Sequence, residues 1–233
     1  MITRPRNPLQ LAPSILTADF GRIADEVQAV APYVDWFHLD VMDGHYVPNL
    51  TFGPSMVEAV RAACDLPLHV HLMIDNPGEF VVPFAAAGAD RITFHPEVTD
   101  HPDAVVHEIK GAGAGVGIAV HPDVGLECAE KYLSEVDVVL MMTVRPGFGG
   151  QKFMPEVMPK ITDARRLVDS RGVEADIEVD GGIKVDNIDL VVEAGANIVV
   201  SGSGVFDGVD ASGAAQRLRA RLDLLATNAE DAS

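Results

Sequence analysis

Short apolar runs alternate with segments of helical period eight times along this chain, and this rhythm restricts its fold more than any other feature. The apolar runs predict strands at Leu11–Leu16, Asp35–Val41, Leu66–Ile74, Ala89–His95, Gly115–His121, Val136–Val144, Ala175–Asp180 and Asn197–Ser201. The segments between and after them predict helices at Phe20–Ala31, Met56–Ala63, Glu79–Ala87, Pro102–Gly111, Gly125–Leu133, Pro155–Ser170, Asp186–Ala194 and Gly213–Leu225. Strands that alternate with helices in this way indicate parallel βαβ units of an α/β protein.

Eight such units close into a (β/α)8 TIM barrel with a parallel sheet, at a chain length that is usual for this fold. An open doubly wound sheet is the alternative, but the GxGxxG that would favour it does not follow the first strand. The 233 residues contain no linker or low-complexity tract. We therefore expect a single catalytic barrel domain over residues 1–226, followed by a polar tail at 227–233 that is predicted to be disordered.

The net charge and the length of the apolar runs limit the classes of partner that this chain can bind. A formal charge of −18 argues against nucleic acid, whose phosphates it would repel. No apolar run approaches the length of a membrane span, and the N-terminus lacks the pattern of a signal peptide. With only two cysteines and no CxxC, the chain is predicted to be cytoplasmic. Any anionic substrate must be held by local donors that overcome the negative field.

The segment WFHLDVMDGHYVPN at 36–49 carries the densest chemistry. On its predicted strand His38 and Asp40 share a face, about 7 Å apart along the chain. In isolation such a pair is best explained as a hydrogen bond in a polar layer. However, His71 and Asp180 also stand near the ends of predicted strands. Two imidazoles and two carboxylates on one rim of a barrel predict a four-ligand metal site.

Further candidate site residues lie at or just after predicted strand ends: Ser14, Gly147, Phe148, Gly149, Gly150, Gly181, Gly182, Gly202 and Ser203. The loop at 146–150 is either an ordinary long turn or, as we favour, a lid that donates backbone N–H groups to a ligand. The glycines at 181, 182 and 202 follow the seventh and eighth strands, where barrels often bind phosphate through backbone amides. Such amides bind an anion without needing lysine.

Asp40 and Asp180 are predicted to approach a substrate from opposite sides of the barrel. If a metal polarises a carbonyl, the adjacent C–H becomes acidic, so one carboxylate can remove the proton while the other returns one to the opposite face. That reaction is an epimerisation α to a ketone. Met42, Met73 and Met142 are expected to line the cavity and exclude water, although methionine is more often ordinary core.

Six motifs together resemble the ribulose-phosphate 3-epimerase family over residues 11 to about 225. They are SILTADF (14–20), HLDVMDGHYVPNLTFGP (38–54), HLMIDNP (71–77), TVRPGFGGQKF (143–153), EVDGGI (178–183) and VSGSGVF (200–206). The resemblance implies conversion of D-ribulose 5-phosphate to D-xylulose 5-phosphate, within pentose phosphate metabolism, through a metal-stabilised enediolate. It also implies a homo-oligomer.

The resemblance further assigns roles to residues of this chain. One divalent metal per subunit is implied at His38, Asp40, His71 and Asp180, with Asp40 as proton acceptor and Asp180 as proton donor. Mixed imidazole and carboxylate ligands favour Zn²⁺, Mn²⁺, Fe²⁺ or Co²⁺ over Mg²⁺. Ser14 and His71 would contact the substrate. Gly147 to Gly150 would form the lid, and the glycines at 181, 182 and 202 with Ser203 would hold the phosphate.

The chain departs from the usual family pattern at His69, Arg145 and His121. One alternative function is a 3-epimerase of a hexulose 6-phosphate such as allulose 6-phosphate, because the same chemistry needs only a roomier pocket. A second alternative is a phosphosugar-binding barrel without catalysis. That alternative predicts a missing carboxylate, and both Asp40 and Asp180 are present.

Overall fold

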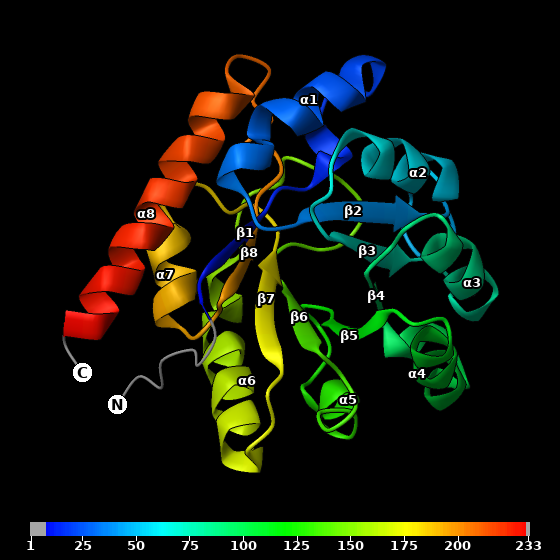
Figure 1. The fold of residues 1–233 in the computed structure, drawn as a ribbon. Helices are drawn as coiled ribbons and strands as arrows, with labels where there is room; N and C mark the ends of the chain where they lie inside the picture. The colour runs from blue at the N-terminus through cyan, green and yellow to red at the C-terminus, as the bar shows by residue number, and fades with distance from the viewer. Residues whose placement is uncertain (1–7, 232–233) are drawn as a thin grey trace.

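A computed structural model describes the backbone of residues 8–231 and the side chains of residues 8–228, and it forms a ring of parallel strands surrounded by helices (Figure 1). The strands are β1 Gln10–Ala12, β2 Phe37–Met42, β3 Leu68–Met73, β4 Arg91–Phe94, β5 Gly115–Val120, β6 Val138–Met142, β7 Asp176–Asp180 and β8 Ile198–Val200. The α-helices are α1 Ile23–Val30, α2 Pro54–Ala63, α3 Gly78–Ala86, α4 Pro102–Gly111, α5 Glu127–Glu130, α6 Met158–Arg171, α7 Ile188–Glu193 and α8 Ala211–Asp231. Among them lie the short 3-10 helices η1 Ile15–Thr17, η2 Phe20–Arg22, η3 Ala31–Tyr33, η4 Pro96–Val98 and η5 Pro155–Val157.

The sheet is continuous from β1 through β8 and then down to β2, and every pairing within it is parallel. The remaining gap between β1 and β2 is spanned by a parallel bridge between Ser14 and His38. There the His38 backbone N–H donates to the Pro13 carbonyl at 3.0 Å. The (β/α)8 barrel predicted from the sequence is therefore confirmed.

Alternation along each strand decides which side chains enter the barrel. On β2 the residues Phe37, Leu39 and Val41 belong to the apolar core between strands and helices. His38 and Asp40 therefore point to the opposite face, into the barrel. The same alternation on β7 sends Glu178 and Asp180 inward. A small apolar cluster, composed of Ala12, Val138, Ile198 and Val200, packs on the β1, β6 and β8 side of the barrel. Asp180, the last residue of β7, lies at the C-terminal rim.

Most elements begin or end within three residues of the predicted bounds, and the first strand, the fifth helix and the last helix are among those that differ. The first strand ends at Ala12 rather than Leu16, because Pro13 has no N–H to continue the ladder and Ser14 caps η1 through its hydroxyl. The fifth helix, predicted at Gly125–Leu133, covers only Glu127–Glu130 (α5) in the structure. The last helix continues from the predicted end at Leu225 to Asp231, through most of the tail for which disorder is predicted. No glycine or proline interrupts 226–231, and the Thr227 hydroxyl donates to the Asp223 carbonyl at 3.0 Å.

None of the helices described by the structure has the length and apolar character needed to cross a membrane.

Candidate active site

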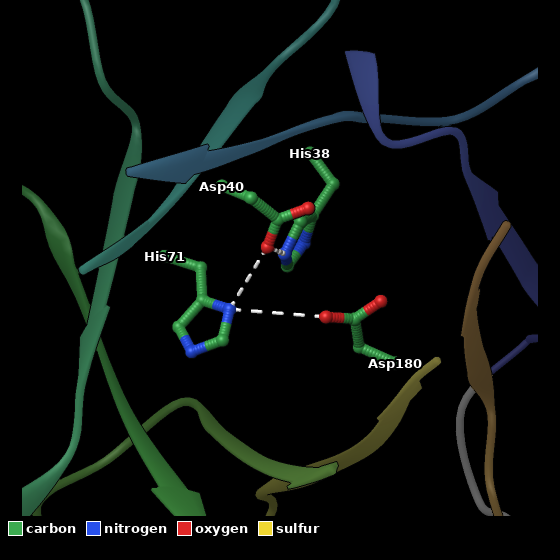
Figure 2. A group of neighbouring side chains, drawn as sticks. All are labelled: His38, Asp40, His71 and Asp180. Atoms are coloured by element: carbon green, nitrogen blue, oxygen red, sulfur yellow. Dashed lines mark hydrogen bonds and ion pairs between the residues drawn. The ribbon is translucent and has the colours of Figure 1, made fainter. Parts of the chain in front are cut away.

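The four predicted metal ligands converge at the C-terminal rim of the barrel (Figure 2). Register pairs Asp40 on β2 with His71 on β3, and β7 brings Asp180 to the same point. His71 Nδ1 lies 3.1 Å from Asp40 Oδ1 and 3.8 Å from Asp180 Oδ2, and His38 Nε2 lies 3.2 Å from Asp40 Oδ1. One donor atom from each of the four residues lies within 4.8 Å of all the others. Two nitrogen and two oxygen donors this close fit a divalent transition metal.

A second row of polar groups lies deeper in the barrel, and its central residue, Glu178, was missed by the sequence analysis. His38 Nδ1 and His69 Nδ1 lie 3.0 and 3.1 Å from the same Glu178 oxygen, Oε1. Thr93 Oγ1 lies 2.6 Å from His69 Nε2. Because a carboxylate only accepts, His38 donates its Nδ1–H to Glu178 and turns Nε2 toward Asp40. Glu178 stands two residues before Asp180, so the i, i+2 rule that linked His38 to Asp40 would have found it. His69, noted as a departure, belongs to this deeper row.

Asp40 and Asp180 have opposite electrostatic environments. Burial would raise the pKa of Asp40, but the imidazoles of His38 and His71 outweigh burial and hold that pKa well below its usual range. Burial raises the pKa of Asp180 well above its usual range, and the negative charge of Asp40 adds to the effect. The two pKa values are thus shifted in opposite directions, an asymmetry typical of an acid/base pair.

The two histidine ligands also differ. Burial lowers the pKa of His71 to about 3, which leaves its ring neutral and able to offer a lone pair. Burial would also lower the pKa of His38, but the carboxylates of Asp40 and Glu178 outweigh it and raise that pKa well above its ordinary value. A metal ion at Asp40 would displace the extra proton, since a ligating imidazole must be neutral.

The rim around Asp40 and Asp180 is hollowed into a pocket. Its lining includes these two aspartates and the three predicted methionines, Met42, Met73 and Met142. It also includes the predicted substrate residues Ser14, Gly147, Phe148, Gly149, Gly150, Gly181, Gly182, Gly202 and Ser203. Of the predicted substrate residues, only His71 is not part of the lining. His38 and His71 lie beneath it with no exposed surface. Ser14 donates its hydroxyl to Asp40 Oδ2 at 2.5 Å, so it orients the carboxylate on the side away from His71.

The pocket lining also contains Pro146 of the predicted lid and five residues that were not predicted: Leu16, Thr17, Val144, Gln151 and Ile183. Thr17 is the most informative of them. Its hydroxyl oxygen is buried and has no hydrogen-bond partner among the described residues. A Cβ built on Gly202 would lie 3.2 Å from that oxygen, so the hydroxyl lies against the glycine turn after β8. A lone threonine in a short 3-10 helix gives no signal that sequence reasoning could use.

The loop after β6, residues 143–153, covers one side of the pocket and is held by side-chain amides. Asn49 Nδ2 donates to the Gly147 carbonyl at 2.7 Å. Gln151 Nε2 donates to the Arg145 and Phe148 carbonyls at 2.7 and 2.9 Å. The tip between these anchors carries Phe148, which is 54% exposed.

The other two departures from the family pattern, Arg145 within this loop and His121 after β5, both contact Asp123 outside the pocket lining. Arg145 forms an exposed ion pair with Asp123 at 3.0 Å. His121 Nδ1 accepts from the Asp123 backbone N–H at 3.1 Å.

Comparison with known proteins gives one consistent result. A family model described as "Ribulose-phosphate 3 epimerase family" matches residues 10–206. A ribulose-phosphate 3-epimerase from Mycobacterium leprae is 48% identical over 91% of this chain and 94% of its own length. A protein of the same name from Bacillus subtilis is 45% identical over 91% of this chain and 98% of its own length. Another from Escherichia coli K12 is 43% identical over 91% of this chain and 95% of its own length.

Solved structures share the fold at lower identity. KGPDC from Streptococcus mutans in complex with D-R5P has a TM-score of 0.74 at 16% identity, covering 92% of this chain and 97% of that one. A 3-hexulose-6-phosphate synthase has a TM-score of 0.71 at 22% identity, covering 91% and 99%.

Proposed function

Because the chain belongs to the ribulose-phosphate 3-epimerase family, we propose that it inverts C3 of D-ribulose 5-phosphate to give D-xylulose 5-phosphate. One observation carries the chemistry. Asp40 and Asp180 face the same pocket from β2 and β7, with pKa values shifted in opposite directions. Two such groups allow one to accept a proton while the other gives one.

The proton transfers are divided between the two aspartates. Asp40, held as a carboxylate by His38 and His71, accepts the C3 proton of the ketose from one face. Asp180 delivers a proton to the opposite face of the resulting enediolate, so the configuration at C3 inverts. In the reverse direction the roles exchange. Ser14 keeps the Asp40 carboxyl oriented through its 2.5 Å hydrogen bond.

His38, Asp40, His71 and Asp180 are the residues that would hold a divalent cation, and their donor set fits one. When bound, such an ion supplies Lewis-acid polarisation of the substrate carbonyl. The Met42, Met73 and Met142 side chains make the walls beside this group apolar and exclude water from the reacting carbon.

The phosphate is proposed to bind at the turns after β7 and β8. Among the residues that the structure describes, the backbone N–H groups of Gly202 and Ser203 donate to no protein acceptor. The unpartnered Thr17 hydroxyl lies beside Gly202 and adds a third donor. Gly182 lies so close to Phe153 that a Cβ there would meet its backbone N at 2.4 Å, which keeps this turn open only to glycine. Neutral donors of this kind hold an anion despite the net charge of −18.

A coupled assay tests the proposal directly. Protein purified without oxygen and analysed for bound metal is expected to convert D-ribulose 5-phosphate faster than allulose 6-phosphate. A preference for the hexulose phosphate would favour the alternative substrate, and binding of both without turnover would favour a non-catalytic barrel. Full activity in a preparation shown to be free of metal would overturn the proposed metal site.

The proposed cytoplasmic location agrees with Cys64 and Cys128, which are both free thiols. The homo-oligomer stays a prediction from the family resemblance.

A further inference from the structure

His71 makes a second contact on the side of its ring that faces away from the other ligands. Figure 2 shows its Nδ1 directed at Asp40 and Asp180, with the other ring nitrogen pointing away from them. That second nitrogen, Nε2, lies 3.0 Å from Nε2 of His95, the residue that follows β4. His95 Nδ1 in turn lies 3.2 Å from Oε1 of Glu97 in η4. A chain of side chains thus runs from the candidate metal site to a carboxylate at the surface.

The two imidazoles are shielded from water, while the carboxylate is not. His71 and His95 have no exposed surface, whereas the Glu97 side chain is 28% exposed. Burial would raise the pKa of Glu97, but its hydrogen bonds with His95 and Tyr46 contribute to lowering that pKa. Glu97 is therefore an ionised acceptor at neutral pH, while water cannot substitute for either buried contact.

When both imidazoles are neutral, counting protons along this chain fixes the direction of each hydrogen bond. An ionised carboxylate only accepts, so His95 must carry its proton on Nδ1 and donate it to Glu97. A neutral imidazole has one N–H, so His95 Nε2 is an acceptor. The proton between the rings then belongs to His71 Nε2, which leaves a lone pair on His71 Nδ1.

This tautomer leaves one contact without a proton. His71 Nδ1 faces Asp40 Oδ1 at 3.1 Å, and in this arrangement both atoms are acceptors. Two acceptors in a buried site repel each other unless a positive group lies between them. A metal ion bound by both atoms supplies that positive charge without requiring a proton. The opposite tautomer satisfies Asp40 but turns the lone pair of His95 Nδ1 toward Glu97.

We propose that Glu97 is a positioning residue that acts through His95 to hold His71 in the tautomer whose Nδ1 binds the metal ion. The inference rests on the metal site of the proposed function and extends it to two residues outside the pocket lining. Glu178 makes the equivalent contact with His38 directly, whereas Glu97 reaches His71 through a second imidazole. Both histidine ligands thus have their distal nitrogen tied to a carboxylate.

The full-length protein loaded with Zn²⁺ allows the tautomers to be read by NMR of ¹⁵N-labelled histidine, because this ion is diamagnetic. The expected result is a proton on Nδ1 of His95 and on Nε2 of His71. Zn²⁺ affinity, measured by competition with a chromogenic chelator, is expected to fall about tenfold or more in Glu97→Leu, the usual effect of removing an outer hydrogen-bond partner.

Tyr46→Phe is the matched control. The Tyr46 hydroxyl donates to the same Glu97 oxygen at 2.9 Å, and its ring lies 5.0 Å from the His95 ring. The variant keeps the ring and the His95–Glu97 bond and removes only the hydroxyl, so Zn²⁺ affinity is expected to stay within about twofold. Glu97→Gln keeps an acceptor oxygen of the same reach and is expected to recover most of the affinity lost in Glu97→Leu.

Two results would overturn the positioning role: a proton on Nε2 of His95 in the zinc-loaded wild type, or wild-type Zn²⁺ affinity in Glu97→Leu. The first measurement uses no variant, so it decides the question even if Glu97→Leu does not fold. A wild type that binds no Zn²⁺ would instead overturn the metal site itself, and the inference would fall with it.

Discussion

At the scale of single residues, the two aspartates give the most direct test of inversion. Asp180→Asn keeps the shape of the side chain but removes the acid from one face of the substrate. Epimerisation is expected to fall by about 10²–10⁴, the usual effect of losing a positioned acid or base. Asp40 still exchanges the C3 proton of one epimer with solvent on its own face. The variant in D₂O should therefore lose the C3–H signal of one pentulose phosphate in ¹H NMR without forming the other.

Asp40→Asn is the mirror experiment and should exchange the opposite epimer. Metal content must be measured in both variants, because each aspartate is also a proposed ligand and a lost ion would imitate a lost base. Near-normal interconversion by metal-loaded Asp180→Asn would contradict the division of roles between the two carboxylates.

What the sequence revealed about the site depends on how far each residue lies from the pocket. His38 and Asp40 could be paired from alternation along one strand, and the structure brings them together with His71 and Asp180 as expected. Glu97 and His95 could not be recognised, because their contact with His71 exists only after β3 and β4 pair. Nothing in the local pattern distinguishes such a histidine from one buried in the core.

At the scale of elements, the loop at 143–153 is the segment whose function a single substitution can probe. A Cβ at Gly149 would lie 2.7 Å from Thr17 Cγ2, so Gly149→Val must push the loop or η1 away from the pocket. We expect a higher KM and a lower kcat, with kcat/KM falling about tenfold to a hundredfold. Gly111→Val at the end of α4 is the control, since a Cβ there meets no atom within 4 Å. Unchanged kinetics in a folded Gly149→Val would make this loop an ordinary turn.

Strand and helix order could be predicted from the sequence because apolar periodicity reports burial. The ends of elements were less predictable, since they depend on single backbone groups. Pro13 ends β1 early, and the continuation of α8 past Leu225 follows from the absence of a breaking residue rather than from any apolar pattern. These errors did not affect the prediction of the site, because the site depends only on the register of β2, β3 and β7 near their C-terminal ends.

At the scale of the whole molecule, the interior of the barrel contains buried acidic groups whose negative charge needs a positive partner. Asp40, Asp180 and Glu178 enter the same interior, where burial and then the negative charge of Asp40 raise the pKa of Asp180. Closure between β1 and β2 rests on a narrow bridge at Ser14 and His38, directly beside these groups. A cation bound by residues of β2, β3 and β7 would both neutralise charge and connect strands from two sides of the barrel.

Metal binding is therefore expected to stabilise the fold as a whole. An ion present at about a hundred times its Kd contributes about 2.7 kcal/mol when it binds only the folded state. For a chain of this size that contribution corresponds to a rise in Tm of about 5–10 °C. Scanning calorimetry of chelator-treated protein with and without added Zn²⁺ measures the shift, and Mg²⁺ should give less because imidazole is a poor ligand for it. His71→Ala should lose most of the zinc-dependent shift, while His107→Ala, which changes an exposed histidine on α4, should keep it. An equal shift in both variants would mean that zinc acts on the acidic surface and not on the rim of the barrel.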